Sequence, residues 1–262
     1  PLDHPWELLS ASPVAFNKKM PVPKEITPKD MEELISQFVQ AAEKADEAGF
    51  DLIELQAHHG FLLASFLSPL TNLRTDEFGG SVENRIKFPL RVFQAIRKVF
   101  PQHKPISVRI SAEDWAENGI TETEVLAISS AFKDADIINV SSGNTVEHQQ
   151  LQVGRMWQTP FADAVRNSIG VPTITTGYIQ DIDQVNTILL NGRADLVALG
   201  RPLLLDPNFV RHAQAYEQVD ASDIPQQYLA GKSHLYPLRS AERKMVEQMK
   251  KALKPESHKR KE

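Results

Sequence analysis

The chain has no cysteine among its 262 residues. Disulfides, iron–sulfur clusters and thiolate zinc sites all require cysteine, so the sequence excludes these three kinds of structural support. It also lacks a signal peptide, and no apolar run approaches the roughly 18 residues that a membrane-spanning helix needs. Together these absences predict a cytoplasmic protein.

A strong excess of charge of one sign is also missing. The formal net charge at pH 7 is −5, which is too modest to predict a nucleic-acid or membrane partner. The first residue is proline rather than methionine, which favours a fragment or an excised domain. With 41% hydrophobic residues and no linker-like stretch within residues 28–210, the chain is expected to form one large α/β domain.

Patterns of strands and helices fill most of the chain. Residues 1–26 carry five prolines and no clean periodicity, and are expected to be an irregular lead-in. Apolar spacing and N-cap signals predict five helices, at residues 27–49, 81–99, 121–133, 159–168 and from 181 onward. Short apolar or alternating runs predict five strands, at residues 50–57, 105–111, 136–141, 172–176 and 195–199.

Strands that alternate with helices at this spacing predict a parallel sheet covered by helices. Five βα units already occupy residues 50–210, whereas a closed (β/α)₈ barrel, or TIM barrel, needs eight. A barrel therefore leaves three strands unaccounted for, and they would have to precede Pro1. An open, doubly wound sheet of five strands is the rival, and it needs no further strand.

The first predicted strand carries polar residues on one face. Side chains alternate along a strand, so Glu54 and Gln56 share a face and point into the barrel if helices cover the outside. Gln56 and His59 would then lie at the carboxyl end of the strand, where such folds place their sites. His58 and His59 together suggest a metal site, but adjacent residues at a strand end point apart and no second ligand cluster is present, so no metal is expected.

The second predicted strand repeats this pattern, with Ser107, Arg109 and Ser111 on one face. An inward-facing arginine near the end of a strand favours an anion or an electron-rich carbonyl beside it. A buried ion pair between Arg109 and Glu54, with no ligand, is an equally weighted alternative.

The last two units carry a different signal. Gly177 lies between a strand end and a helix start, and Gly200 and Arg201 follow the next strand. Glycine lets backbone N–H groups approach an anion, and arginine with a helix N-terminus holds a phosphate. The final two strands of a barrel occupy the standard phosphate position of that fold, although most glycines between strands and helices are only turns.

Four motifs, in this order and spacing, resemble the old yellow enzyme family of FMN-dependent, NAD(P)H-oxidising barrels over residues 27–210. They are HHGFLLASFLSPLTNLRTDEFGGSVENR, SVRIS, TTGYI and ALGRPLLLDP. Further segments are more specifically similar to the C-terminal, reductase-like part of flavoproteins of the salicylyl-CoA 5-hydroxylase and 2-aminobenzoyl-CoA monooxygenase type. They are SASP, SPLTN, RISAEDW, VSSGNT, GRMWQTPFAD, GRADL and QQYLAGK.

The resemblance implies a (β/α)₈ barrel of which this chain contains only the last five βα units. It implies FMN and NAD(P)H as cofactors, with FAD in an upstream domain as a further expectation. By the same resemblance, Arg109 would contact the flavin ring, while Gly177, Gly200 and Arg201 would hold the FMN phosphate.

The family's two ligands for a substrate carbonyl or phenolate fall on Gln56 and His59, and its proton-donating tyrosine falls on Phe61. Gln56 stands in place of a histidine and can donate a hydrogen bond, but it brings no positive charge. Phe61 cannot donate a proton, which disfavours reduction of an activated alkene. Hydride transfer from a nicotinamide to a flavin needs only stacking and orientation, so both changes are compatible with it.

The expected organisation is a lead-in (1–26), a partial FMN-binding barrel (27–215) and a C-terminal extension with a basic, disordered tail (216–262). The expected function is NAD(P)H-dependent flavin reduction in the C-terminal part of an aromatic acyl-CoA hydroxylase or monooxygenase. A stand-alone ene-reductase with an altered acid and a catalytically silent fragment are the alternatives. The expected partners are an aromatic or acyl-CoA carbonyl substrate, an upstream N-terminal domain and, through unpaired sheet edges, other copies of the chain.

Overall fold

The computed structural model describes residues 6–220 and 224–253. The chain divides into two compact units, Pro1–Leu199 and Gly200–Glu262. The boundaries predicted at residues 26 and 215 stay predictions, and the last part of the predicted basic tail, from residue 254 onward, lies outside the described residues.

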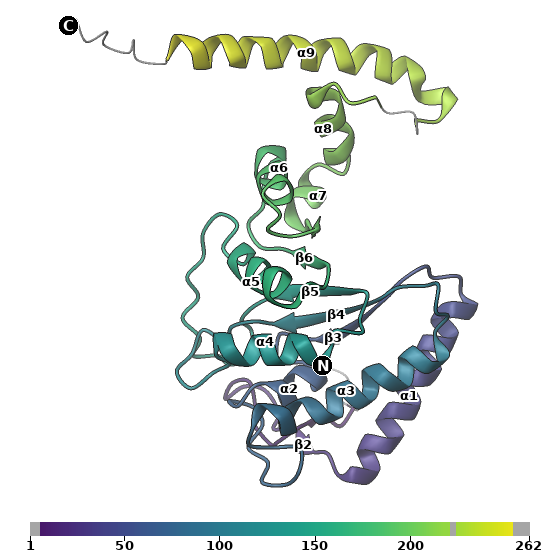
Figure 1. Ribbon diagram of the computed structural model, residues 1–262, viewed down its shortest axis with the longest axis vertical. Helices are drawn as coiled ribbons and strands as arrows, with labels where there is room; N and C mark the ends of the chain where they lie inside the picture. The colour runs from purple at the N-terminus through teal and green to yellow at the C-terminus, as the bar shows by residue number, and fades with distance from the viewer. Residues whose placement is uncertain (1–5, 221–223, 254–262) are drawn as a thin grey trace, which may run out of the picture. The chain divides into compact units, whose positions relative to one another are not determined.

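The first unit is built on a five-stranded parallel sheet (Figure 1). Its strands lie side by side in chain order: β3 (Ile53–Ala57), β4 (Ile106–Ser111), β5 (Ile137–Ser141), β6 (Thr173–Thr175) and β7 (Leu196–Val197). A doubly wound sheet reverses its strand order at a switch point. This order has no reversal, so the structure favours the partial barrel over the doubly wound rival.

The predicted helices form with the expected start signals. They are α1 (Pro28–Glu47), α3 (Val82–Val99), α4 (Glu122–Ala131), α5 (Thr159–Ile169) and α6 (Ile182–Leu190). The capping boxes at Thr27 and Thr121 are both formed, and Asp181 accepts a hydrogen bond from the Gln184 backbone N–H. The α3 helix continues through Pro89. Local N-cap chemistry therefore accounts for these starts, except at α5, where Gln158 makes no side-chain cap and a proline lies in the first turn.

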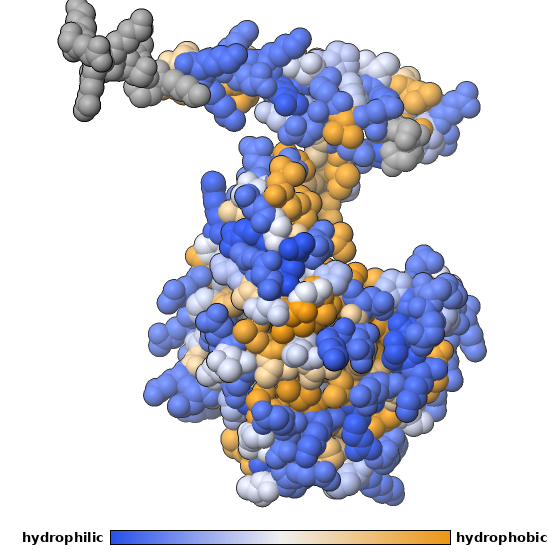
Figure 2. Space-filling view, in the orientation of Figure 1, coloured by the Kyte–Doolittle hydropathy of each residue, from blue (hydrophilic) through white to orange (hydrophobic). Residues whose placement is uncertain are grey.

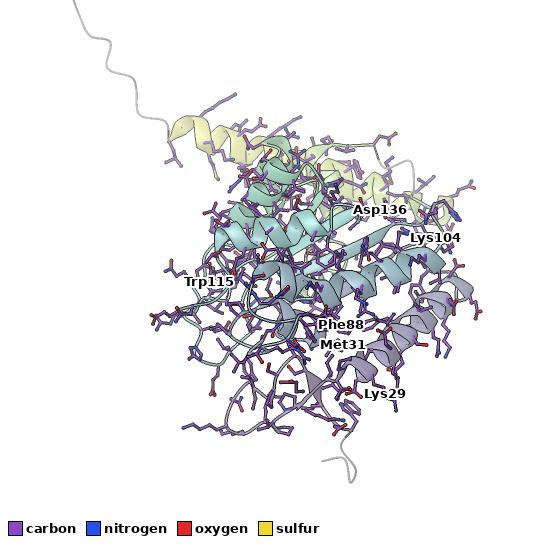
Figure 3. All side chains as sticks on the ribbon, turned by 60° about the horizontal axis from the view of Figure 1, so that its bottom comes forward. Lys29, Met31, Phe88, Lys104, Trp115 and Asp136 are labelled. Atoms are coloured by element: carbon purple, nitrogen blue, oxygen red, sulfur yellow. The ribbon has the colours of Figure 1, made fainter. Side chains whose placement is uncertain are left out.

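One face of the sheet holds the hydrophobic core. Val108, Ile110, Ile138 and Val140 point to the helix-covered face and are at most 1% exposed. The helices contact one another in chain order, α1 with α3, α3 with α4 and α4 with α5. Figure 3 labels two fully buried side chains of this layer, Met31 from α1 and Phe88 from α3.

The lead-in is more regular than predicted. β1 (Leu9–Ser10) and β2 (Lys24–Glu25) form a short parallel pair, and α2 (Leu62–Leu67) follows the first strand of the main sheet. The guanidinium of Arg74 fixes the lead-in, because Nη1 donates to the carbonyls of Ala11 (3.1 Å) and Ile26 (2.8 Å). Two-residue strands leave no periodicity in the sequence, which explains why the pattern missed them.

The second unit contains only helical elements among its described residues. They are α7 (Arg201–Leu205), α8 (Phe209–Glu217), the 3₁₀-helix η1 (Gln226–Tyr228) and α9 (Leu229–Ala252). α8 packs on α9, and an ion pair of 3.3 Å joins Glu217 to Arg243. α9 is largely hydrophilic (Figure 2), and none of the described helices is both long and apolar enough to cross a membrane.

Candidate functional site

The face of the sheet opposite the core carries a row of polar side chains. The register pairs Gln56 with Arg109 and Arg109 with Asn139, and it pairs Glu54 with Ser107. Because residues paired in register point to the same face, these five side chains share one side of the sheet. The strand alternation used for the prediction thus gave the correct partition of polar and apolar faces.

Glu54 is engaged with neutral partners on this face. Its Oε2 accepts hydrogen bonds from Ser107 Oγ and from Asn139 Nδ2, both at 2.9 Å. Within the part of the chain that the structure describes, no ion pair joins Glu54 to Arg109. The alternative prediction of a direct Arg109–Glu54 pair is therefore wrong, because Ser107 on the neighbouring β4 and Asn139 on β5, two strands away, donate to Glu54 instead.

Arg109 has an N–H donor that no protein group engages. Its Nε is buried and has no hydrogen-bond partner, and neither has Oδ1 of the neighbouring Asn139. Burial lowers the pKa of Arg109, and the negative charge of Glu54 only partly offsets this effect. A buried donor without a partner costs about 1–3 kcal/mol. A bound ligand that hydrogen-bonds to both Arg109 and Asn139 would remove this cost.

Two histidines follow the first strand of this sheet, and both are held neutral. Burial lowers the pKa of His58 to about 3, with further contributions from the charges of Arg109 and His59. Burial and Arg109 also lower the pKa of His59, to about 4, against a hydrogen bond with the Ser142 backbone that raises it. The two rings are tilted, with their centroids 4.1 Å apart. Among the described residues, no group of three or more metal-ligating side chains includes them.

The backbone turns sharply at His59. Its φ is +53° and that of Gly60 is +70°, two successive left-handed residues. The His59 N–H donates to Ser111 Oγ at 2.9 Å, and a Cβ on Gly60 would lie 2.9 Å from the Asn144 carbonyl oxygen. Glycine is thus required where this loop approaches the loop after β5.

His59 and Phe61 line a cavity of about 510 Å³, whereas Gln56 does not. Gln56 lies instead on the exposed polar face of the sheet beside Arg109. The structure therefore does not bring Gln56 and His59, predicted to act as a pair, to one cavity, because the strand ends between them and the backbone turns into the left-handed conformation at His59.

Gly177 has a clear structural reason to be glycine. Its φ is +98°, and a Cβ there would lie 2.8 Å from Trp157 Nε1 and still closer to Gln158 Nε2. Two N–H donors thus crowd the Gly177 backbone. Gly200 and Arg201 belong to the second unit, where Gly200 precedes the first residue of α7. The phosphate site predicted from Gly177, Gly200 and Arg201 stays a prediction.

A polar network that the sequence interpretation missed joins the ends of two strands. Trp115 Nε1 donates to Ser142 Oγ (3.0 Å), and Ser142 Oγ donates to Gln158 Oε1 (3.3 Å). The rings of Trp115 and Trp157 lie 5.4 Å apart, and Figure 3 labels Trp115. These residues come from separate loops, so no local spacing in the sequence signals that they meet.

The polar face fits the ring of a flavin. The pyrimidine edge of an isoalloxazine offers carbonyl acceptors and an N–H donor side by side. Arg109 Nε is an unpartnered donor and Asn139 Oδ1 an unpartnered acceptor on adjacent, register-paired strands. The residues present therefore match the hydrogen-bonding pattern of FMN at this end.

Comparison with known proteins identifies the family. The sequence profile of the NADH:flavin oxidoreductase / NADH oxidase family matches residues 6–219. This chain belongs to that family. An NADPH dehydrogenase of Clostridium acetobutylicum is 44% identical over 225 residues, which make up 85% of this chain and 66% of that protein. An NADPH dehydrogenase of Bacillus subtilis is 39% identical over 209 residues, 79% of this chain and 61% of that protein.

Solved structures agree on the fold. A 2-naphthoyl-CoA reductase in complex with 2-naphthoyl-CoA is 27% identical, with a TM-score of 0.74, over 79% of this chain and 33% of that chain. A histamine dehydrogenase from Rhizobium sp. 4-9 is 27% identical, with a TM-score of 0.70, over 79% of this chain and 31% of that chain.

These findings confirm the family predicted from the four motifs. The chain spans 66% or less of the length of the two curated relatives named above. Their names support neither an acyl-CoA hydroxylase nor a monooxygenase, and nothing in them supports FAD in an upstream domain.

Proposed function

We propose that this chain is part of an FMN-dependent oxidoreductase that takes hydride from NAD(P)H. The observation that carries the proposal is Arg109, a half-buried arginine whose Nε has no partner, on the polar face of a parallel sheet in a flavin oxidoreductase family. An arginine that no carboxylate pairs with directly suits a ring that becomes electron-rich on reduction.

The chain's own residues would hold the cofactor at two ends. Arg109 would donate to the flavin ring, and Asn139 Oδ1 would accept from it, while Glu54 fixes the orientation of the Asn139 amide through Nδ2. By family resemblance, the phosphate contacts would come from Gly177, Gly200 and Arg201. When bound, FMN would supply a ring that accepts hydride and passes the electrons on.

The residues of the site say less about the second substrate, the compound that would accept the electrons from the flavin. Phe61 has no proton to give, and His59, with a pKa of about 4, is neutral at physiological pH. An ene-reductase would therefore need its proton from elsewhere. A second candidate is an aromatic acyl-CoA, supported by the structural similarity to a protein that binds 2-naphthoyl-CoA. The hydroxylase assignment rests only on the sequence resemblance, and oligomerisation and an upstream partner domain remain proposals as well.

The test measures FMN binding, by quenching of flavin fluorescence, and NADPH oxidation, by loss of nicotinamide absorbance. Both are measured on this chain and on a form extended at its N-terminus to the length of its relatives. Arg109→Met should weaken FMN binding about tenfold to a hundredfold, since a hydrogen bond to a charged group contributes about 1.5–3 kcal/mol.

Arg91→Met is the matched control, because Arg91 lies on α3 with its side chain 42% exposed and paired with Glu32. It should bind FMN as the unsubstituted protein does. The proposal is wrong if neither form of the protein binds FMN, or if Arg109→Met and Arg91→Met bind it equally well.

A further inference from the structure

The longest of the described helices, α9, lies beyond the part of the chain that the family accounts for. The family profile matches residues 6–219, whereas α9 spans Leu229–Ala252 in the second unit. One face of α9 packs on α8, where Arg243 pairs with Glu217 at 3.3 Å. None of the residues of α9 is buried, so the other face of this helix is a surface whose purpose family membership leaves open.

This other face carries an exposed apolar stripe. Its members recur at helical spacing and are Leu238, Ala241, Met245, Met249 and Ala252; we call them the α9 stripe. A helix with 3.6 residues per turn places all five on one side. The three large side chains, Leu238, Met245 and Met249, keep 56%, 52% and 54% of their surface exposed. Methionine adapts its shape to a neighbour, so the α9 stripe suits a protein surface.

The spacing of the α9 stripe indicates the shape of the partner. Intervals of three and four residues give the narrow seam along which two helices pack side by side. Helices that lie on a lipid surface present Trp, Phe and Leu instead, and Leu238 is the one member of the stripe that belongs to these types. Glu242 lies one turn from both Leu238 and Met245, where an anionic lipid surface would repel its carboxylate. The stripe therefore favours a second helix over a membrane.

The charges of α9 indicate the sign of the partner. The helix contains six Lys or Arg residues against two Glu, and both glutamates already pair with arginines of α9 itself. Lys244 and Lys251 directly precede two members of the stripe and are exposed. Within the described residues, neither lysine pairs with a carboxylate. Charged residues that flank a helix seam pair with opposite charges on the facing helix, so the complementary helix is acidic.

A second copy of α9 does not supply these acidic residues. In an antiparallel pair in register, residues that flank the seam face their own counterparts, so Lys244 and Lys251 would face lysines. In a parallel pair, Lys244 would face Met249 of the second copy. Neither arrangement places a carboxylate beside these lysines, and like charges opposite each other destabilise a helix pair. The α9 stripe is thus not complementary to itself.

We propose that the α9 stripe docks an amphipathic helix of another protein, one whose apolar seam is flanked by glutamate or aspartate. The apolar seam covers the stripe, and the acidic residues pair with Lys244 and Lys251 at its edge. The inference does not depend on the proposed function, because α9 contains none of the residues assigned to FMN.

Fluorescence anisotropy of labelled synthetic peptides, titrated with the full chain, tests this inference. The acidic peptide has a leucine seam of about three heptads flanked by glutamate, and the basic peptide has the same seam flanked by lysine. A scrambled acidic peptide keeps the composition of the first but has no seam. We expect saturable, one-to-one binding of the acidic peptide, about tenfold weaker binding of the basic peptide, and no binding of the scrambled peptide.

A substitution in the stripe tests the apolar contact. Met245→Glu places a carboxylate in the seam and should weaken binding of the acidic peptide about tenfold or more. Met20→Glu is the matched control, because Met20 is 49% exposed, against 52% for Met245, and belongs to the first unit. Its affinity for the acidic peptide should equal that of the unsubstituted chain.

Reversal of the flanking charges tests the sign of the partner. A double variant, Lys244→Glu with Lys251→Glu, should change the preference from the acidic to the basic peptide. The matched control is Lys87→Glu with Lys133→Glu, at two exposed lysines of the first unit. This control should keep the preference for the acidic peptide.

The inference is overturned if the scrambled and seamed acidic peptides bind equally well, or if Met245→Glu and Met20→Glu bind the acidic peptide equally well. An unchanged preference after reversal of Lys244 and Lys251 would also overturn it. Two other occupants have their own signatures. Self-association of the chain that Met245→Glu abolishes, measured by light scattering, would assign the stripe to a second copy instead. Sedimentation with phosphatidylserine vesicles that Met245→Glu abolishes would assign it to a lipid surface instead.

Discussion

Acidification should destabilise the first unit through His58. Its side chain is 5% exposed, and its Nδ1 is buried without a partner. Burial, Arg109 and His59 lower its pKa from 6.5 to about 3. The unfolded chain therefore binds a proton at His58 as the pH falls below 6.5, while the folded chain does not. The contribution of neutral His58 to the free energy of unfolding is therefore fully present above pH 6.5 and is lost progressively as the pH falls toward 3.

The size of the effect follows from the window of pH. Each pH unit between the two pKa values costs about 1.4 kcal/mol, so His58 removes about 2 kcal/mol from the free energy of unfolding at about pH 5. His59, with its pKa lowered to about 4, acts in the same direction. Carboxylates with lowered pKa values, such as Asp76, start from 3.8 and lose their contribution only at lower pH. Between pH 6.5 and 5, the change in the free energy of unfolding therefore comes from the histidines rather than from these carboxylates.

Urea unfolding near neutral pH and at about pH 5, followed by tryptophan fluorescence, measures this effect. All three tryptophans, Trp6, Trp115 and Trp157, belong to the first unit. The variant His58→Leu should reduce the loss of stability on acidification by about 2 kcal/mol, whatever its absolute stability. His103→Leu, which removes an exposed histidine, should leave the loss unchanged. If His58→Leu loses as much stability as the unsubstituted chain does, the reasoning is refuted.

Three further substitutions test the anchors of the fold, each by urea unfolding. Arg74→Met leaves the carbonyls of the lead-in and Asp76 without their donor, and should cost about 3 kcal/mol; a loss below 1 kcal/mol would argue that water replaces the guanidinium. Gly177→Ala should cost about 1–3 kcal/mol because its φ is +98° and Trp157 and Gln158 crowd the site. Thr121→Ala removes the N-cap of α4 and should cost about 1 kcal/mol, whereas Thr187→Ala, at an exposed position inside α6, should cost less.

The helices could be predicted because their start signals are local. A threonine or aspartate side chain that caps a helix needs only residues three positions away, so Thr27, Thr121 and Asp181 announce their helices in the sequence. The faces of the strands could be predicted for the same reason, since alternation is a property of one strand. The short β1–β2 pair could not, because Arg74, which fixes it, is distant in sequence.

At the candidate site, the local pattern predicts the face on which a side chain lies but not its partners on other strands. Alternation places Arg109 and Glu54 on one face, but it does not say which strand neighbours compete for Glu54. The register decides: Glu54 lies opposite Ser107, while Arg109 lies between Gln56 and Asn139. Asn139 and Ser107 satisfy Glu54 with two neutral hydrogen bonds.

In this arrangement, the charge of Glu54 acts on Arg109 without occupying the hydrogen-bond donors of Arg109. A direct pair with Glu54 would have neutralised Arg109 and engaged its donors, leaving little for a ligand. With Glu54 held by Ser107 and Asn139, its charge still stabilises the guanidinium at longer range, and the donor groups stay available. Replacing Ser107 by alanine removes one of the two hydrogen bonds that hold Glu54 and leaves Asn139 in place. Glu54 should then turn toward Arg109, so FMN affinity should fall even though Ser107 is given no contact with FMN. Equal FMN affinity in Ser107→Ala and in the unsubstituted protein would show that Glu54 does not compete for Arg109.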